Sequence, residues 1–155
     1  MSKADDDAEF TSDNVMILFM GGSHEHAITS IQHFVPDAVH IVTSTKYEKP
    51  YRRRLSDWSK KFKFRRGTVQ SISDLFEPSS VSSLIGCAWR VAGHEHDFSE
   101  GRMDTWKWTI GITGGTMHMA AVASLVAGVL DANAFYVIEP EDGAAIMPNR
   151  DVIML

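Results

Sequence analysis

Several features that would define the class of this protein at once are scarce or missing from its sequence. Among 155 residues there is a single cysteine, Cys87, which excludes an internal disulfide framework and a cysteine-based zinc cage. No apolar run approaches the length that spans a bilayer, and the acidic N-terminus does not resemble a signal peptide. Neither a P-loop nor the Gly-x-Gly-x-x-Gly dinucleotide fingerprint occurs. We therefore expect a cytoplasmic protein with no membrane segment, in which Cys87 is a buried structural thiol.

Positive charge is scarce outside one stretch of the chain. Residues 46–66 hold ten of the 15 lysines and arginines and only two acidic residues, Glu48 and Asp57. This stretch carries about +8, in a chain whose net charge is −5. Such a concentration indicates either a local anionic partner or a solvated helix face. No helix-turn-helix pattern accompanies it, so we predict no direct DNA binding.

Residues 1–13 differ in composition from the rest of the chain. They are polar, acidic and without hydrophobic periodicity, which predicts a disordered leader. Residues 14–155 are enough for one domain with a sizeable core. That domain either stands alone or has been cut from a longer effector protein.

Apolar segments and helical patterns alternate along residues 14–155. This alternation predicts an α/β, Rossmann-like fold with a mainly parallel sheet of about five to six strands, flanked by helices. Residues 93–105 are polar and are predicted to form a loop. The tail 151–155 is either a last edge strand or the end of a cut. The other predicted strands are 15–20, 38–43, 66–72, 108–112 and 134–138.

Three short polar loops, residues 21–24, 43–46 and 113–116, each follow a predicted strand and are therefore predicted to lie on one rim of the sheet. Ligands of open α/β sheets bind at this rim, beyond the carboxyl ends of the strands. The three loops are rich in glycine and hydroxyl groups, contain no acidic residue, and two of them lead directly into a helix. A helix N-terminus offers backbone N–H groups to an anion, although the glycines could equally serve a tight turn alone. The candidate ligand contacts are Gly21, Gly22, Ser23, His24, Thr43, Ser44, Lys46, Thr113, Gly114, Gly115, Thr116, Met117 and His118.

Two His-Glu-His triplets, at 24–26 and 94–96, have a spacing found in some metal sites. The first runs into a predicted helix, where residues two apart point in different directions, and the second has no third histidine nearby. We therefore predict no metal and no cofactor. The tryptophans Trp89, Trp106 and Trp108 are predicted to lie in the core or in a dimer interface.

The sequence resembles the CRISPR-associated Rossmann fold, or CARF, domains over most of residues 15–140. The likeness rests first on a strand that ends in Gly21-Gly22-Ser23 and on Pro-Asp-Ala-Val-His-Ile-Val-Thr-Ser at 36–44. Its most specific part is Gly-Ile-Thr-Gly-Gly-Thr-Met-His-Met at 111–119, followed by an alanine-rich helix and Ala-Phe-Tyr-Val at 134–137.

The resemblance implies a homodimer that binds a cyclic oligoadenylate, a second messenger of type III CRISPR antiviral defence, across its two-fold axis. We expect the four-membered ring, in contact with residues 21–24 and 113–118. Some members of the family are ring nucleases that cut the messenger. Others only sense it and switch an attached effector domain or a partner.

Cleavage needs no metal, because the ribose 2′-OH can attack its neighbouring phosphate when it is held in line. Ser23, His24 and His118 are the candidate catalytic residues, as groups that orient the ribose or transfer a proton. A free-standing domain favours a ring nuclease. Met117 favours a sensor, since the family's turn often has a lysine there. An unrelated Rossmann-like nucleotide enzyme and a regulator that uses residues 46–66 are the alternatives.

Overall fold

The computed structural model describes residues 14–73, 77, 79–100, 107–114, 117–137 and 152–155. The predicted leader, Trp106, Gly115 and Thr116 lie outside these ranges, and so do the side chains of Thr113 and Met117. No helix in the described ranges is long and apolar enough to cross a membrane.

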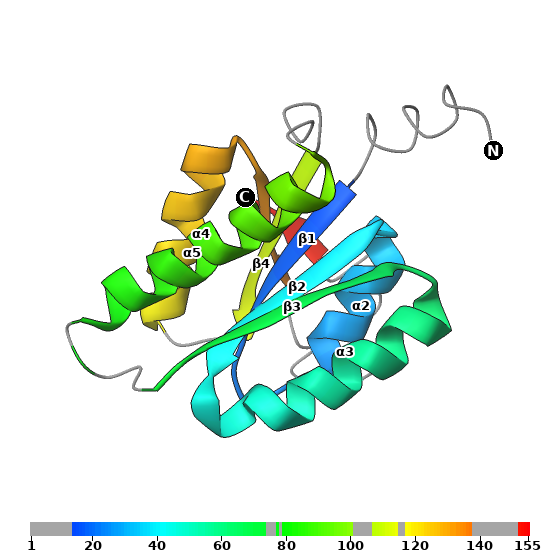
Figure 1. Ribbon diagram of the computed structural model, residues 1–155, viewed down its shortest axis with the longest axis horizontal. Coiled ribbons are helices and arrows are strands. Elements are labelled where there is room, and N and C mark those ends of the chain that lie inside the picture. Colours follow the sequence, from blue (N-terminus) through cyan, green and yellow to red (C-terminus); the bar gives the residue numbers. More distant parts are fainter. Residues whose placement is uncertain (1–13, 74–76, 78, 101–106, 115–116, 138–151) are drawn as a thin grey trace.

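A six-stranded sheet in the order β3-β2-β1-β4-β5-β6 forms the centre of the molecule (Figure 1). All neighbouring pairs are parallel except β5 and β6, which are antiparallel. The predicted α/β fold is therefore confirmed, and the tail contributes an edge strand. The strands are β1 (Asn14–Met20), β2 (Ala38–Ser44), β3 (Arg65–Ile72), β4 (Lys107–Gly114), β5 (Asn133–Val137) and β6 (Val152–Met154).

Helices cover both faces of the sheet, two on each side (Figure 1). One face packs against α4 and α5, and the other against α2 and α3. A short 3-10 helix, η1, joins β2 to α3. The helices are α2 (Glu25–Phe34), η1 (Thr45–Tyr47), α3 (Glu48–Phe62), α4 (Ser80–Phe98) and α5 (Met117–Leu130).

The central strand β1 shows why the strands are continuous apolar runs. Val15, Ile17 and Phe19 pack in the core with α4 and α5, whereas Met16 and Leu18 pack in the core with α2 and α3. A strand buried on both faces favours apolar side chains at successive positions, as is usual in parallel sheets.

The prediction of a loop over residues 93–105 was wrong for its first part, because α4 continues to Phe98. Val91, Glu95 and Ser99 are buried at helical spacing, so this polar-looking stretch does present an inner face. Within residues 93–98, the buried position is that of a carboxylate, Glu95. This charged residue made the segment resemble a loop in the sequence.

A β-bulge interrupts the pairing of β2 with β3. Two residues of β3, Gly67 and Thr68, lie opposite the single residue His40 of β2. At Gly67 a Cβ would lie 2.3 Å from the carbonyl oxygen of Val39 and 2.7 Å from the ring of His40. Only glycine therefore fits at this point of the bulge.

Candidate ligand site at the rim of the sheet

The carboxyl ends of the parallel strands form one rim, and the strand order reverses at β1. The chain adds β2 and β3 on one side of β1 and then β4 and β5 on the other, which makes the β1–β4 boundary a topological switch point. Met20 at the end of β1 pairs with Gly114 at the end of β4. The two glycine turns predicted from the sequence therefore begin side by side.

The first turn, residues 21–24, is supported from below by α3. The hydroxyl of Tyr51, which is fully buried, donates to the carbonyl oxygen of Gly21 at 2.5 Å and to that of Ser23 at 3.2 Å. The hydroxyl of Tyr47 would lie 3.2 Å from a Cβ at Gly22. Neither tyrosine was predicted from the sequence, because the positions of Tyr47 in η1 and Tyr51 in α3 give no sign that they reach a neighbouring turn.

Within this turn, Ser23 is exposed and His24 is half-buried. His24 is the N-cap residue of α2 and makes no capping hydrogen bond through its side chain. His26, two residues on, is buried, and its ring nitrogen Nε2 lies 3.1 Å from the carbonyl oxygen of Ser23. The side chains of Ser23 and His24 are thus placed at the rim, while His26 supports the turn from inside.

An acidic side chain lies at this helix N-terminus. Glu25 Oε2 accepts a hydrogen bond from the backbone N–H of His24 at 3.2 Å. The backbone N–H of Glu25 itself has the largest effect in holding the pKa of this carboxyl below its usual range; burial opposes it, and the N–H of His24 adds to it. Glu25 is therefore ionised at neutral pH. The Glu25 carboxylate accepts a hydrogen bond from a backbone N–H group that an anionic ligand would otherwise use. This was not predicted from residues 21–24.

At the end of β2 the predicted contacts divide into inner and outer residues. Thr43 is fully buried, and its hydroxyl donates to the carbonyl oxygen of Met20 at 2.8 Å, so it ties β2 to β1. Ser44 is 9% exposed. Lys46, in η1, is exposed, with Nζ 5.4 Å from the centre of the Tyr47 ring. Lys46 is thus the cation that β2 brings to the rim.

β4 ends at Gly114, and α5 begins at Met117, shortly after it along the chain. His118, in the first turn of α5, is exposed. This helix start and the start of α2 follow the two strands at the switch point, so both direct backbone N–H groups to the same part of the rim. The contacts predicted at Gly115 and Thr116 lie outside the described residues.

A buried ionic cluster at the opposite end of the sheet was also missed. Glu95 of α4 contacts His40 Nε2, and it accepts two hydrogen bonds from the guanidinium of Arg65, at 2.7 and 3.1 Å. His40 and Glu95 are both 0% exposed. The backbone N–H of Thr68 donates to His40 Nδ1 at 2.9 Å, so the ring carries its proton on Nε2 and donates it to Glu95.

The two buried groups of this cluster are held in different charge states. Burial lowers the pKa of His40, which outweighs the opposing influence of Glu95 and keeps the ring neutral. For Glu95, burial alone would raise the pKa, but the hydrogen bonds from His40 and Arg65 bring it below its usual range. The cluster joins β2, β3 and α4 away from the rim. In the sequence, the indication of this cluster was a lone histidine in an apolar strand, which was too weak to predict it.

No group of three or more potential metal ligands is found among the described residues. Within the second His-Glu-His triplet, His94 and His96 are exposed, whereas Glu95 points inward. Cys87 is buried, and burial raises the pKa of its thiol.

The groups that the rim offers to a ligand are hydroxyl, imidazole, ammonium and backbone N–H groups. This set of donors is suited to phosphates.

Comparisons with known proteins bear on the fold. No protein-family model matches the chain, and no curated protein matches it significantly. Among solved structures, Csm6 from Enterococcus italicus bound to cyclic hexa-2′-fluoro-hexa-dAMP matches with a TM-score of 0.65 and 11% identity. VC1899 from Vibrio cholerae matches with a TM-score of 0.60 and 14% identity. Can2 from Sulfobacillus thermosulfidooxidans in complex with cyclic tetra-adenylate matches with a TM-score of 0.56 and 14% identity.

These matches cover 89%, 83% and 86% of this chain, but only 37%, 32% and 33% of the respective solved chains. The chain thus spans about one third of the length of the structures that it matches. At such low identity the likeness establishes the fold. On that ground the chain has a CARF-like Rossmann fold, as its resemblance to that family predicted.

Proposed function

We propose that the rim binds a cyclic oligoadenylate, the four-membered ring in the first place. The observation that carries this proposal is the pairing of Met20 with Gly114, which brings the ends of β1 and β4 together at the switch point, each followed along the chain by a helix N-terminus. Phosphates of a ring need several donors over a short distance, and this arrangement supplies them from backbone and side chains. The Csm6 and Can2 structures contain rings of this chemical class, which supports the choice of ligand.

The exposed side chains of the rim have roles that follow from their chemistry. Ser23 hydrogen-bonds a phosphate or a ribose hydroxyl, and Lys46 supplies a positive charge. His24 and His118 offer imidazole groups from two different helix starts. Thr43 acts indirectly, since its hydroxyl is already bound to Met20.

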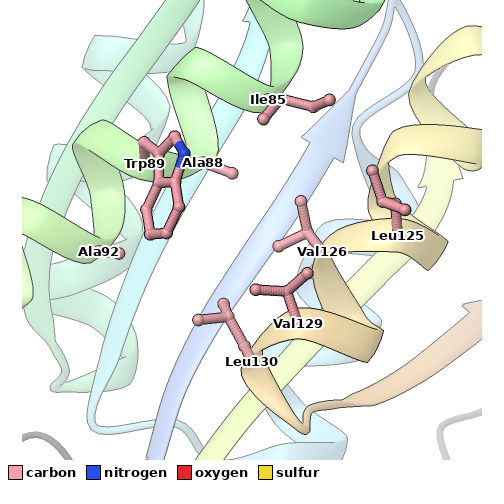
Figure 2. A pocket seen from close by; sticks show the side chains of 8 residues that line it. All are labelled: Ile85, Ala88, Trp89, Ala92, Leu125, Val126, Val129 and Leu130. Atoms are coloured by element: carbon pink, nitrogen blue, oxygen red, sulfur yellow. The ribbon is translucent and has the colours of Figure 1, made fainter.

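We also propose that the functional unit is a homodimer. Between α4 and α5 lies a small apolar pocket of about 70 Å³ that opens at the surface (Figure 2). Trp89, Leu125 and Val129 at this pocket are 65%, 55% and 69% exposed. Because α5 begins at the rim, an isologous contact through this helix pair with its two-fold axis parallel to the strands would bring two copies of the rim to the same side of a dimer. Exposed apolar patches of this kind are typical of interaction sites.

Sensing and cleavage are two forms of this function. For cleavage, the oxygen of a ribose 2′-OH forms a bond to the adjacent phosphorus as the bond to the 5′-oxygen breaks. The proton leaves the 2′-OH, and the 5′-oxygen gains one, which gives a linear product with a 2′,3′-cyclic phosphate. Ser23, His24 and His118 are the candidates to position or protonate these oxygens. A sensor would use the same contacts for binding alone.

The test is incubation of the protein with labelled cyclic tetra-adenylate and cyclic hexa-adenylate in the presence of EDTA, with adenosine monophosphate as a control. Bound ring and linear product are measured separately. Binding with linear product would identify a ring nuclease, and binding without it a sensor. Failure to bind either ring would reject the proposal. Ser23→Ala and His118→Ala should each weaken binding or turnover, and the exposed control Gln32→Ala on α2 should not.

A further inference from the structure

Helix α3 lies along β3 and runs from the rim to the opposite end of the sheet (Figure 1). Its first residue, Glu48, accepts a hydrogen bond at 3.0 Å from the hydroxyl of Ser71, near the carboxyl end of β3. After its last turn the chain enters β3, where the backbone N–H of Arg65 donates to the carbonyl oxygen of Asp37, directly before β2, at 2.7 Å. The 15 residues of α3 rise about 1.5 Å each, so its two ends lie about 20 Å apart and only the N-terminal end is at the rim.

The two sides of α3 differ in charge. The inner side packs on the sheet through the buried residues Tyr51, Leu55 and Trp58. Lys49 and Arg53 lie one turn apart on the outer side, and both are exposed. The exposed basic residues of α3 and its C-cap are Lys49, Arg52, Arg53, Lys60, Lys61 and Lys63.

Near the rim, these basic residues differ in whether an acidic group neutralises them. Arg52 forms an ion pair with Glu48 at 3.2 Å. In the part of the chain that the structure describes, Lys49 and Arg53 form no such pair. The Cα–Cβ bonds of a helix tilt towards its N-terminus, which directs both side chains towards the rim. Lys49 and Arg53, the near pair, therefore add uncompensated positive charge beside the rim.

The near pair lies beside the proposed site and not beneath it. Tyr51, which lies between the two in sequence, faces inward and donates its hydroxyl to the carbonyl oxygen of Gly21 at 2.5 Å. A helix with its side chains is about 10 Å thick, which separates the outer side of α3 from this turn. That distance is about one Debye length at 0.1 M salt, so the near pair acts on a ligand at the rim through its field.

We propose that Lys49 and Arg53 speed the capture of the cyclic oligoadenylate by electrostatic attraction, without contacting the bound ring. This steering rests on the function proposed for the rim. The chain carries −5 in total and residues 46–66 carry about +8, so the other residues carry about −13. An anionic ring is therefore repelled by much of the protein and attracted along α3. Because the attraction grows with the charge of the ligand, it favours a ring of several phosphates over a single nucleotide.

The test is stopped-flow measurement of association and dissociation with fluorescent cyclic tetra-adenylate. Lys49→Gln with Arg53→Gln should lower the association rate constant about fivefold at about 0.1 M salt and leave dissociation within about twofold. At about 1 M salt the difference should disappear, since the Debye length is then about 3 Å.

The matched control is the far pair, Lys60 and Lys61. Lys60→Gln with Lys61→Gln removes the same charge from the same helix, but about 16 Å further from the rim. This double variant should change the association rate constant by less than about twofold at about 0.1 M salt, because screening weakens its field at the rim.

A second measurement does not depend on the ring. Ser23→Cys places a thiol at an exposed position of the rim, and Cys87 is buried, so the unmodified protein gives the background rate. The thiol reacts with a disulfide reagent that carries two carboxylates and, separately, with a neutral dipyridyl disulfide. The ratio of the two rates reports the field, because both reactions need the same thiolate. Removing the charges of the near pair should lower this ratio about twofold, and removing those of the far pair should leave it unchanged.

Failure of the steering and failure of the proposed function give different results. If neither cyclic tetra-adenylate nor cyclic hexa-adenylate binds, the proposed function is rejected, and the steering of that ring with it. If a ring binds and the near pair does not affect its association, the steering alone is overturned. Equal effects of the near and far pairs, an effect on dissociation in place of association, or an unchanged ratio of thiol rates would also overturn it.

Discussion

At the scale of single residues, the rim depends on side chains that a ligand would not touch. Tyr51 is fully buried, and its hydroxyl donates to two carbonyl oxygens of the first glycine turn. Burial raises the pKa of Tyr51 to about 12, so the phenol keeps its proton throughout the neutral range. By occupying the carbonyl groups of Gly21 and Ser23, it leaves backbone N–H groups as the main-chain groups that the turn can offer to a phosphate.

Replacing Tyr51 by Phe tests this support. The variant keeps the ring but removes the hydroxyl donor from the carbonyl oxygen of Gly21 and leaves that of Ser23 with the contact from His26, which should lower the free energy of unfolding by about 1–3 kcal/mol. The affinity for the ring should fall as well, because the turn loses its anchor. Urea unfolding and a ligand titration measure the two effects. Tyr136→Phe, at a partly exposed tyrosine of β5, is the control and should change neither.

Glu25 occupies the start of α2, where the proposed anionic ligand would bind. Glu25→Gln removes a negative charge from this helix N-terminus and should strengthen binding of the ring by roughly two- to fivefold. The gain should shrink at high salt, since Glu25 is exposed. Titrations at low and high ionic strength check this. The control is Asp131→Asn, directly after the C-terminal end of α5. Weaker binding in Glu25→Gln would show that the carboxylate contacts the ligand favourably.

At the scale of elements, hydrophobic periodicity was enough to predict the strands and the layers. Runs such as Val15–Met20 are typical of strands buried on both faces, and their alternation with helical patterns implied parallel pairing. Two glycine turns before helices then indicated the rim. Periodicity could not predict the contacts between elements. Tyr51 beneath the first turn and Glu95 beside His40 depend on the packing of helices on the sheet, and neither position differs in pattern from an ordinary helix residue.

The cluster of His40, Glu95 and Arg65 should make the joint between β2, β3 and α4 sensitive to acid. The pKa of His40 is lowered from 6.5, so below about pH 6.5 the unfolded chain binds a proton that the folded chain does not. Glu95, whose pKa is also lowered, adds a further loss as the pH falls below about 4.5. The free energy of unfolding should therefore decrease from pH 7 to pH 4.

Urea unfolding as a function of pH measures this decrease. For His40 alone, the slope approaches about 1.4 kcal/mol per pH unit between its folded and unfolded pKa values. His40→Gln should flatten the slope between pH 6.5 and 5, even if it lowers stability at every pH. His33→Gln, at an exposed position of α2, is the control. A slope in His40→Gln equal to that of the unmodified protein would contradict the role given to this histidine.

At the scale of the whole molecule, the outer surface of α4 and α5 is the surface of the proposed dimer contact. Trp108 lies in the core, which is one of the two places predicted for the tryptophans. Trp89 of α4 instead lies across the pocket from Leu125 and Val129 of α5 (Figure 2). Trp89→Glu would place a charge in the proposed dimer contact and should convert a dimer into a monomer at micromolar concentration. Sedimentation velocity checks this, and Val81→Glu, on the same helix outside the pocket, should remain dimeric. A monomer before any substitution would reject the dimer.

The proposal that a ring is shared by two rims is tested most directly by calorimetric titration with cyclic tetra-adenylate. A ring held across a two-fold axis contacts the same residues of both copies, so one ring should saturate two chains. We expect a stoichiometry of one ring per two chains, and weaker binding in Ser23→Ala. One ring per chain, or no heat of binding with either cyclic tetra-adenylate or cyclic hexa-adenylate, would contradict it.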